Sequence, residues 1–233
     1  MKSIIYYTDN ELDEPLNSIV QMHIHRSNLP IASASLKPIR FGENVVVEGE
    51  RGYPTMVNQI IAALETAVGN HVFFCEHDVL YHPSHFTFTP PKDNIFYYNE
   101  NVWRWLYGSN QAMRHDRMIP LSSMCANREF ALEHYRLRAA RIKEKGWTQD
   151  SKDPKWVRVM GYEPGTKKKK RGGITDDDFE TWSSDFPLID IRHDKTFSPP
   201  KVSLRDFTHK PKNWRELPIE KIVGWDLKEL FKL

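Results

Sequence analysis

The chain has 233 residues, of which 39% are hydrophobic. A chain of this length can bury a substantial core, and one domain is the expectation. Its 33 basic and 31 acidic side chains leave a formal net charge of +2, so no global field favours nucleic acid or a membrane surface. The two cysteines indicate no disulfide framework, and no segment resembles a signal peptide or a membrane span. We therefore expect a cytoplasmic protein.

The first hundred residues alternate between apolar strands and amphipathic helices. Strands are predicted over 3–8, 29–35, 43–50 and 71–78, and helices over 17–25 and 54–68. The second helix is the clearest, because Pro54 suits a first turn, apolar side chains recur on one broad face, and Gly69 is the predicted stop. Short strand–helix–strand links are typical of a parallel sheet. The predicted fold class is α/β, Rossmann-like, with a mainly parallel central sheet flanked by helices.

The second half of the chain is less regular. Its predicted elements are aromatic strands over 94–99 and 101–108, a long helix over 128–146 and a short apolar strand over 188–191. Alternating Trp103 and Trp105 are interpreted as part of a core strand or hairpin rather than a stacking platform. The segment 161–178 combines a KKKKR run with an acidic run and little apolar content, which is typical of a loop.

Charged groups follow apolar strands at two places. The stretch VFFCEHDVLYHPSHF (72–86) leads a buried strand directly into Glu76, His77 and Asp78, and LIDI leads into Arg192 and His193. In parallel α/β sheets, ligands bind outside the carboxyl ends of the strands. A solvated strand end is the simpler reading of any one such acid, but three ionisable groups in a row favour a site.

These features together resemble the GT-A-fold nucleotide-sugar glycosyltransferases. The residues that carry the resemblance are 59–86, with Glu76-His77-Asp78 in the place of that family's D-x-D motif, and PLIDIRH (187–193) with its terminal His. The chain departs from the family pattern, since Glu replaces the first Asp and a His stands between the acids. The resemblance implies one GT-A-like domain over 1–233, with a nucleotide-sugar-binding half (1–100) and an acceptor-side half (101–233).

The resemblance also implies a divalent cation, Mn²⁺ or Mg²⁺, beside the donor diphosphate. Asp78 and His193 are the expected metal ligands, in preference to His209 in the basic tail. The expected nucleotide-sugar-binding residues are Thr8, Asp9, Gly52, Gln59, Glu76, His77 and Arg171. The His77 side chain is expected to turn away from the metal, into packing or hydrogen bonding.

The resemblance implies transfer of a sugar from a nucleoside-diphosphate sugar, expected to be a UDP-sugar, to an acceptor hydroxyl. Glu180 is the candidate catalytic base, expected in a loop that covers the donor, and Asp185, Asp177 and Asp178 are its rivals. The run 167–171 is interpreted as a solvated segment, a lid over the diphosphate or a contact to DNA phosphates. Retention or inversion at the sugar stays open.

The acceptor stays open among a glycan, a small molecule and a modified base in DNA, as in phage-type enzymes. A non-catalytic nucleotide-sugar-binding module is the alternative from a different class. A nucleotidyltransferase is disfavoured, because TDNELDEP after the first strand is acidic and lacks glycine.

Overall fold

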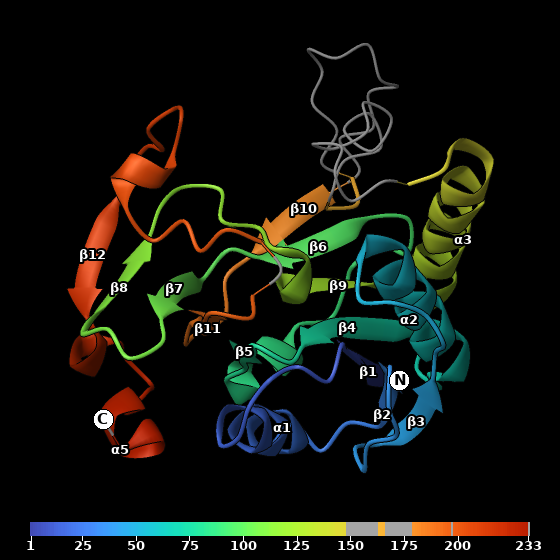
Figure 1. Cartoon of the computed structure of the whole chain (residues 1–233), viewed down its shortest axis with the longest axis horizontal. Coiled ribbons are helices and arrows are strands. Elements are labelled where there is room, and N and C mark those ends of the chain that lie inside the picture. The colour runs from blue at the N-terminus through green and yellow to red at the C-terminus, as the bar shows by residue number, and fades with distance from the viewer. Residues whose placement is uncertain (148–162, 166–178, 197, 233) are drawn as a thin grey trace.

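The computed structural model describes residues 1–147, 163–165, 179–196 and 198–232, which form two β-sheets with helices packed against them (Figure 1). The larger sheet has the strand order β10-β6-β9-β4-β1-β2-β3. Its strands are β1 (Lys2–Thr8), β2 (Ile31–Ser35), β3 (Glu43–Val46), β4 (His71–Glu76), β6 (Phe96–Asn99), β9 (Met124–Asn127) and β10 (Phe179–Trp182). All pairs are parallel except those of β9, which runs antiparallel between β4 and β6. The predicted α/β class with a mainly parallel sheet is therefore confirmed.

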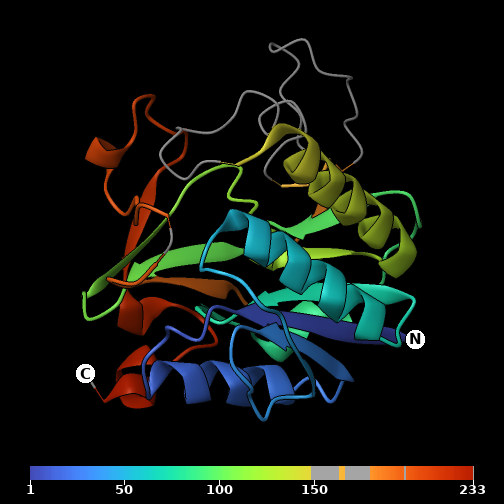
Figure 2. The same ribbon diagram turned by 45° about the vertical axis from the view of Figure 1, so that its right-hand side comes forward.

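Helices cover both faces of this sheet. The helices are α1 (Leu16–His25), α2 (Tyr53–Thr66), α3 (Arg128–Lys145) and a short α5 (Leu227–Phe231). Figure 2 shows α2 and α3 side by side on one face and α1 on the other. Alternate residues of β1 accordingly enter different cores, with Ile4 and Tyr6 packed on the α1 side and Ile5 and Tyr7 on the α2 and α3 side. This burial on both faces explains the unbroken apolar runs of β1 and β4.

The smaller sheet has the strand order β12-β8-β7-β11-β5. Its strands are β5 (Val79–Leu80), β7 (Val102–Leu106), β8 (Gln111–Arg114), β11 (Leu188–Arg192) and β12 (Arg215–Pro218). Short 3₁₀ helices are found at η1 (Pro83–Thr87), η2 (Leu121–Ser123), η4 (Leu204–Asp206) and η5 (Ile219–Lys221). The two-residue β5 begins directly after Asp78, so the chain passes from one sheet to the other at the end of β4. The smaller sheet thereby meets the carboxyl edge of the larger one.

The main differences from the sequence predictions concern element boundaries. β3 stops at Val46, and α2 stops at Thr66 rather than at Gly69, so Val68 lies beyond the helix with 58% of its surface exposed. Gly69 instead allows close packing against β1, because a Cβ there would lie 2.7 Å from the backbone nitrogen of Ser3. The strand β10 was expected to be a loop. Trp103 and Trp105 lie in β7, which forms an antiparallel pair with β8, as the hairpin reading predicts.

The two sheets draw strands from both halves of the sequence. The larger sheet takes β9 and β10 from beyond residue 100, and the smaller sheet takes β5 from before it. A division near residue 100 therefore does not separate the sheets. Within the part of the chain that the structure describes, no helix combines the length and apolar character needed to cross a membrane.

His85 in η1 is a fully buried imidazole in the aromatic core. Its ring stacks on Trp182 with centroids 5.5 Å apart, and its Nδ1 accepts a hydrogen bond from the Asn99 amide at 3.1 Å. The Nε2 atom has no hydrogen-bond partner among the residues that the structure describes. Burial lowers the pKa of His85 to about 3, because a charged ring would lose its hydration. The native state therefore holds this side chain neutral.

His85 should make the fold lose stability in mild acid. Because the pKa is depressed on folding, the unfolded chain binds an extra proton below about pH 6.5, and stability falls by about 1.4 kcal/mol per pH unit below that value. We predict that His85→Phe lowers the free energy of unfolding at pH 7.5, since the Asn99 amide loses one of its two acceptors and keeps only Ser184 Oγ. The same change should flatten the decline of this free energy between pH 6 and pH 4.5. Urea unfolding at a series of pH values measures both effects.

The exposed His209 provides the control for this measurement. His209→Phe should leave both the stability at pH 7.5 and its acid slope close to the wild-type values. An acid slope that is unchanged by His85→Phe would contradict the assignment of this proton uptake to His85.

Candidate functional site

A cavity of about 800 Å³ lies where the carboxyl edge of the larger sheet meets the smaller sheet. The larger sheet and the start of α2 contribute Tyr7, Thr8, Asp9, Glu76, His77, Asp78, Gly52 and Gln59 to its wall. The smaller sheet and its loops contribute Arg104, Arg117, Arg192 and Lys201. This is the edge at which parallel α/β sheets bind ligands, and the volume suits a ligand site.

A group of three potential metal ligands lies at the junction of the two sheets. One ligand atom from each of His77, Asp78 and His193 lies within 4.8 Å of the other two. The side chains are largely buried, with exposed fractions of 15%, 13% and 6%, respectively. Two imidazoles and one carboxylate form a donor set that suits Mn²⁺ and other first-row cations.

The backbone explains why residues so far apart in sequence meet here. β5 follows Asp78 directly and pairs with β11, opposite Asp190 and Ile189. The Ile191 amide donates a hydrogen bond of 2.9 Å to the Asp78 carbonyl, which anchors the end of β11 beside the end of β4. His193 then follows β11, and its own amide is held by the Thr196 hydroxyl at 2.9 Å. Both ligand-bearing backbones are therefore fixed by hydrogen bonds.

The His193 imidazole is the best evidence that this group fits a cation. Its Nε2 atom is buried and has no hydrogen-bond partner among the described residues, and it lies 3.9 Å from Asp78 Oδ2. Burial lowers the pKa of His193, so the ring is neutral near pH 7. An unpartnered buried nitrogen facing a carboxylate oxygen is costly unless a further group joins them. A divalent cation between the two atoms would satisfy both.

The expected orientation of His77 is wrong in part: the side chain does form a hydrogen bond, but it also belongs to the group of potential metal ligands. Its side chain does not turn away from the metal ligands but joins them, and its Nδ1 lies 2.8 Å from Thr8 Oγ1 and 3.6 Å from Asp9 Oδ1. In metalloproteins, a ligating imidazole is commonly oriented by a hydrogen bond from the ring nitrogen that does not bind the metal. β4 ends at Glu76, so the His77 side chain is oriented by its contacts with Thr8 and Asp9 rather than by strand geometry.

Glu76 is the acid of the motif that stays outside the metal group. Its carboxylate accepts a 2.7 Å hydrogen bond from the Tyr7 hydroxyl on the neighbouring strand, where Tyr7 and Glu76 are paired in register. Burial, and secondly the nearby Asp78 carboxylate, raises the pKa of Glu76 to about 8. Glu76 thus presents a carboxyl group, positioned by Tyr7, to the floor of the cavity.

Arg51 connects three segments around the cavity. Its Nε lies 2.5 Å from Asp9 Oδ2, and its NH2 donates to the backbone carbonyl of Lys195. Although burial opposes it, His77 and the hydrogen bond from Arg51 lower the pKa of Asp9. The end of β1, the loop before α2 and the loop after β11 are thereby joined beside the potential metal ligands.

Asp190 forms a buried ion triad in the smaller sheet. Arg104 Nε and Arg192 NH2 each lie 2.8 Å from the same oxygen, Asp190 Oδ2. The exposed fractions are 14% for Arg104, 12% for Arg192 and 4% for Asp190. Although burial opposes it, Asp190 and Asp78 raise the pKa of Arg192, so its guanidinium stays charged.

The sequence-predicted donor residues mostly lie together. Six of them line the cavity: Thr8, Asp9, Gly52, Gln59, Glu76 and His77. Gln59 donates its amide to the Thr8 carbonyl at 2.7 Å, so it supports the end of β1. The seventh, Arg171, lies outside the described residues, as do the run 167–171 and the rival acids Asp177 and Asp178.

The two catalytic candidates are not in the cavity wall. Glu180 was expected in a loop over the donor, but it lies in β10 at the sheet edge, where Lys92 Nζ is 2.8 Å from its carboxylate. Asp185 is exposed and does not line the cavity either. The edge strand β10 was missed because its four residues alternate too briefly to be recognised. The catalytic roles of both acids stay predictions.

Sequence reasoning missed Tyr7, Arg51, Arg104 and Arg192 as cavity residues. Arg192 could have been found, because it directly precedes His193 at the strand end. The other three depend on long-range packing. His209 is exposed and is not part of the metal group, in line with the preference for His193.

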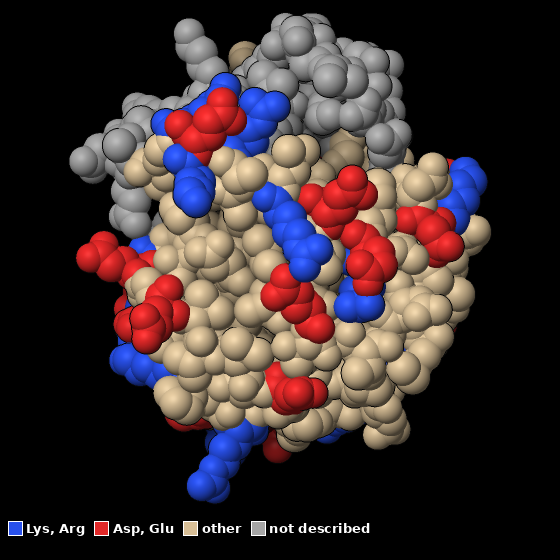
Figure 3. Space-filling view, turned by 90° about the vertical axis from the view of Figure 1, so that its right-hand side faces the viewer, with Lys and Arg blue, Asp and Glu red and all other residues tan. Residues whose placement is uncertain are grey.

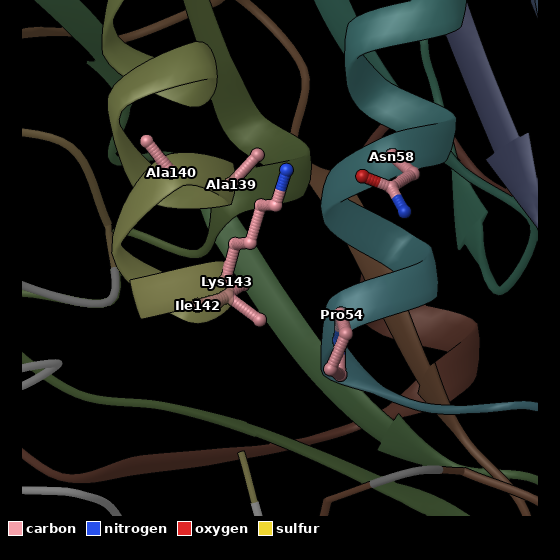
Figure 4. Close-up of a pocket in the computed structure, with 6 residues that line it drawn as sticks. All are labelled: Pro54, Asn58, Ala139, Ala140, Ile142 and Lys143. Carbon is pink, nitrogen blue, oxygen red and sulfur yellow. The ribbon is translucent and has the colours of Figure 1, made fainter. Parts of the chain in front are cut away.

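A smaller hollow of about 360 Å³ lies between α2 and α3 (Figure 4). Its wall is formed by Pro54, Asn58, Ala139, Ala140, Ile142 and Lys143. These side chains offer no acid, imidazole or thiol. On the face that carries these helices, Figure 3 shows acidic and basic side chains interspersed without a patch of one sign. Of these two cavities, only the larger is lined by acids and imidazoles.

No protein-family model matches the chain, and a search of curated proteins finds no match. Solved structures are similar at 9–10% sequence identity. A glycosyltransferase involved in the glycosylation of the major capsid of PBCV-1 matches with a TM-score of 0.44 over 78% of this chain and 81% of its own, at 10% identity. The glycosyltransferase GlyE of Streptococcus pneumoniae TIGR4 matches with a TM-score of 0.42 over 78% of this chain, at 10% identity.

The bifunctional IspDF of Campylobacter jejuni matches with a TM-score of 0.37 over 88% of this chain, at 9% identity. The chain spans only 46% of GlyE and 53% of IspDF. Two of these three proteins are glycosyltransferases, the class that the sequence resembles. Because each TM-score is below 0.5, we base the function on the residues of the chain itself.

The buried ion triad yields a stability prediction. Asp190→Asn removes the one carboxylate between two buried guanidiniums, and an uncompensated buried charge of this kind costs roughly 3–5 kcal/mol. We expect a loss of that order in the free energy of unfolding, measured by urea denaturation at pH 7.5. Asp194→Asn, at an acid that follows β11 but is 87% exposed, should cost less than about 0.5 kcal/mol. Equal effects of the two changes would contradict the importance of the triad.

Proposed function

We propose that the chain is a metal-dependent glycosyltransferase that moves a sugar from a nucleoside-diphosphate sugar, of the UDP-sugar class, to an acceptor hydroxyl. The observation that carries the proposal is the group His77, Asp78 and His193 at the carboxyl edge of the sheet, with the buried His193 Nε2 lacking a partner among the described residues. A strand-borne acid and a distal strand-borne His are the pair that the resemblance predicts as metal ligands.

The three residues would hold Mn²⁺ or Mg²⁺ through one carboxylate oxygen and two imidazole nitrogens. When bound, such a cation neutralises the charge that develops on a diphosphate leaving group. The imidazoles favour Mn²⁺ over Mg²⁺, because Mg²⁺ prefers oxygen ligands. Asp78 and His193 are held by their backbones and His77 by the Thr8 hydroxyl, so the ligands are positioned before the donor arrives.

The donor is proposed to lie between the end of β1 and the start of α2. Thr8 and Asp9 line one side of this part of the cavity, and Gly52, the residue before α2, lines the other. The absence of a side chain at Gly52 gives the first amides of a 14-residue helix access to a ligand, and amides at a helix N-terminus favour phosphate. The base and ribose would contact Thr8 to Asn10, and the phosphates would point to the metal ligands.

Other residues of the chain support charge and orientation. The Arg192 guanidinium lines the same cavity as Asp78 and Glu76 and would add positive charge near the leaving group. Glu76, held by the Tyr7 hydroxyl, is placed to hydrogen-bond a hydroxyl of the ribose or the donor sugar. These contacts would orient the donor for transfer.

Removal of one metal ligand should abolish metal-dependent donor binding without unfolding the chain. We predict that Asp78→Asn and, separately, His193→Ala weaken the Mn²⁺-dependent binding of UDP at least tenfold, because each removes a ligand from a set of three. Isothermal titration calorimetry with and without Mn²⁺ measures the effect, and thermal unfolding checks that the fold survives. The matched control is His209→Ala, which should leave UDP affinity unchanged.

Donor turnover separates an enzyme from a binding module. Slow hydrolysis of a UDP-sugar by the wild-type chain with Mn²⁺, lost in Asp78→Asn, would support the transferase. Tight Mn²⁺-dependent UDP binding with no hydrolysis or transfer for any donor in a panel would favour the non-catalytic module. UDP binding that does not depend on a divalent cation would contradict the metal assignment.

A further inference from the structure

The wall of the cavity that belongs to the smaller sheet is basic, and the proposed donor and metal residues do not use most of it. Arg104, Arg117, Arg192 and Lys201 line this wall, which we call the basic wall. They come from β7, the loop after β8, β11 and the loop after β11. Acids also line the cavity: Asp9, Glu76 and Asp78 belong to the ends of β1 and β4, and Glu163 belongs to the described segment 163–165. None of these four acids comes from the smaller sheet. The cavity therefore has an acidic, metal-binding side and a basic side.

The charges of the basic wall are only partly compensated. Arg104 and Arg192 share a single carboxylate, Asp190, so this triad retains one net positive charge. Arg192 Nε is buried and has no hydrogen-bond partner in the part of the chain that the structure describes. A buried guanidinium N–H without a partner next to a cavity is a donor available to a ligand.

The other two cations have no carboxylate partner among the described residues. Arg117 is an exposed residue of the loop after β8, and its backbone has a φ of 59°. Lys201 Nζ lies 5.7 Å from the centre of the Phe207 ring, which also lines the cavity. Its backbone carbonyl lies 3.4 Å from Arg104 NH1, so Lys201 directly adjoins the triad. With the triad, the basic wall has a net charge of three positive units.

The positively charged side chains form a continuous series of contacts that extends away from the metal ligands. Arg192 and Arg104 each form an ion pair with Asp190, and Arg104 donates a hydrogen bond to the Lys201 carbonyl. The Lys201 ammonium lies over the Phe207 ring. The Phe207 ring in turn contacts the His115 ring, with centroids 5.3 Å apart. The donor diphosphate would be neutralised by the metal, by the start of α2 and by Arg192, which is the member of the basic wall nearest the metal ligands in this series of contacts. The basic wall thus offers more positive charge than the donor needs, at the side left for the acceptor.

We propose that the acceptor carries a phosphate group, which the basic wall binds while the acceptor hydroxyl faces the donor sugar. This inference rests on the proposed function and names the class of its second substrate. Phosphate suits the wall because guanidinium groups bind its oxygens through paired, charge-assisted hydrogen bonds. Lys201 and Arg117 are the specificity-determining residues, and Arg104 and Arg192 form the inner end of the same site.

The test measures phosphate binding to the complex with UDP and Mg²⁺, in which the donor diphosphate position is filled. Inorganic phosphate is titrated by calorimetry into the wild-type chain and into the double variant Arg117→Ser/Lys201→Ser. We expect the double variant to bind phosphate at least about tenfold more weakly, the effect of one lost charge-assisted contact, while its affinity for UDP stays within about twofold. Raising the salt concentration should weaken the wild-type binding.

The control variant is Arg141→Ser/Lys145→Ser, which removes the same charge from exposed positions of α3 outside the cavity wall. It should bind phosphate like the wild type. Equal losses in the two double variants would overturn the proposal, as would the absence of phosphate binding to the wild type. A parallel loss of UDP affinity in Arg117→Ser/Lys201→Ser would also overturn it, because the basic wall would then serve the donor diphosphate.

Two further ligands identify the source of the phosphate. Glucose 6-phosphate, compared with glucose, represents a phosphorylated small acceptor, and a short single-stranded oligodeoxynucleotide represents a polynucleotide. Competition with inorganic phosphate by either one, lost in the double variant, supports the proposal and assigns the source. If the wild type binds phosphate through Arg117 and Lys201 but shows no metal-dependent UDP binding, the proposed function fails while the phosphate site stands.

Discussion

The hydrogen bond from the Ile191 amide to the Asp78 carbonyl is the contact on which the site depends. β1 and β4 are paired in register up to Tyr7 and Glu76, which brings Thr8, Asp9 and the motif acids to one edge. Only the pairing of β5 with β11 adds His193 and Arg192 to that edge. Because this pairing is two residues long, the 2.9 Å bond beyond it determines how closely the two sheets approach. The potential metal ligands therefore lie at a junction between sheets rather than within one of them.

Much of this arrangement could be predicted from local sequence. The apolar runs of β1 and β4, the amphipathic face of α2 and the change from LIDI to Arg192 and His193 identify a parallel sheet with ligands at its edge. These signals work because burial on both faces forces a continuous apolar run. The proximity of Asp78 and His193 was implied by the resemblance to GT-A-fold glycosyltransferases, and the structure brings the two side chains together.

The remaining features depend on partners that are distant in sequence. β10 is an edge strand of four residues, and its place beside β6 follows from pairing with Phe96–Asn99 rather than from its own pattern. That pairing moves Glu180 to an ion pair with Lys92 and away from the cavity. The orientation of His77 is set by the Thr8 hydroxyl across the strand pair, which residue alternation does not encode. Likewise, the sequence predicts Asp190 only as a strand residue, because its ion pair with Arg104 depends on the pairing of β11 with β7.

The exchange of strands between the sheets has a consequence for synthesis on the ribosome. β4 can pair with β9 only after Met124–Asn127 has been synthesised, and β5 can pair with β11 only after residue 192 has been synthesised. A nascent chain that already displays Glu76, His77 and Asp78 therefore lacks the third potential ligand until His193 has been synthesised. Cation capture by this group, as proposed above, therefore requires the pairing of β5 with β11, and chains that stop before His193 lack the full set of potential ligands.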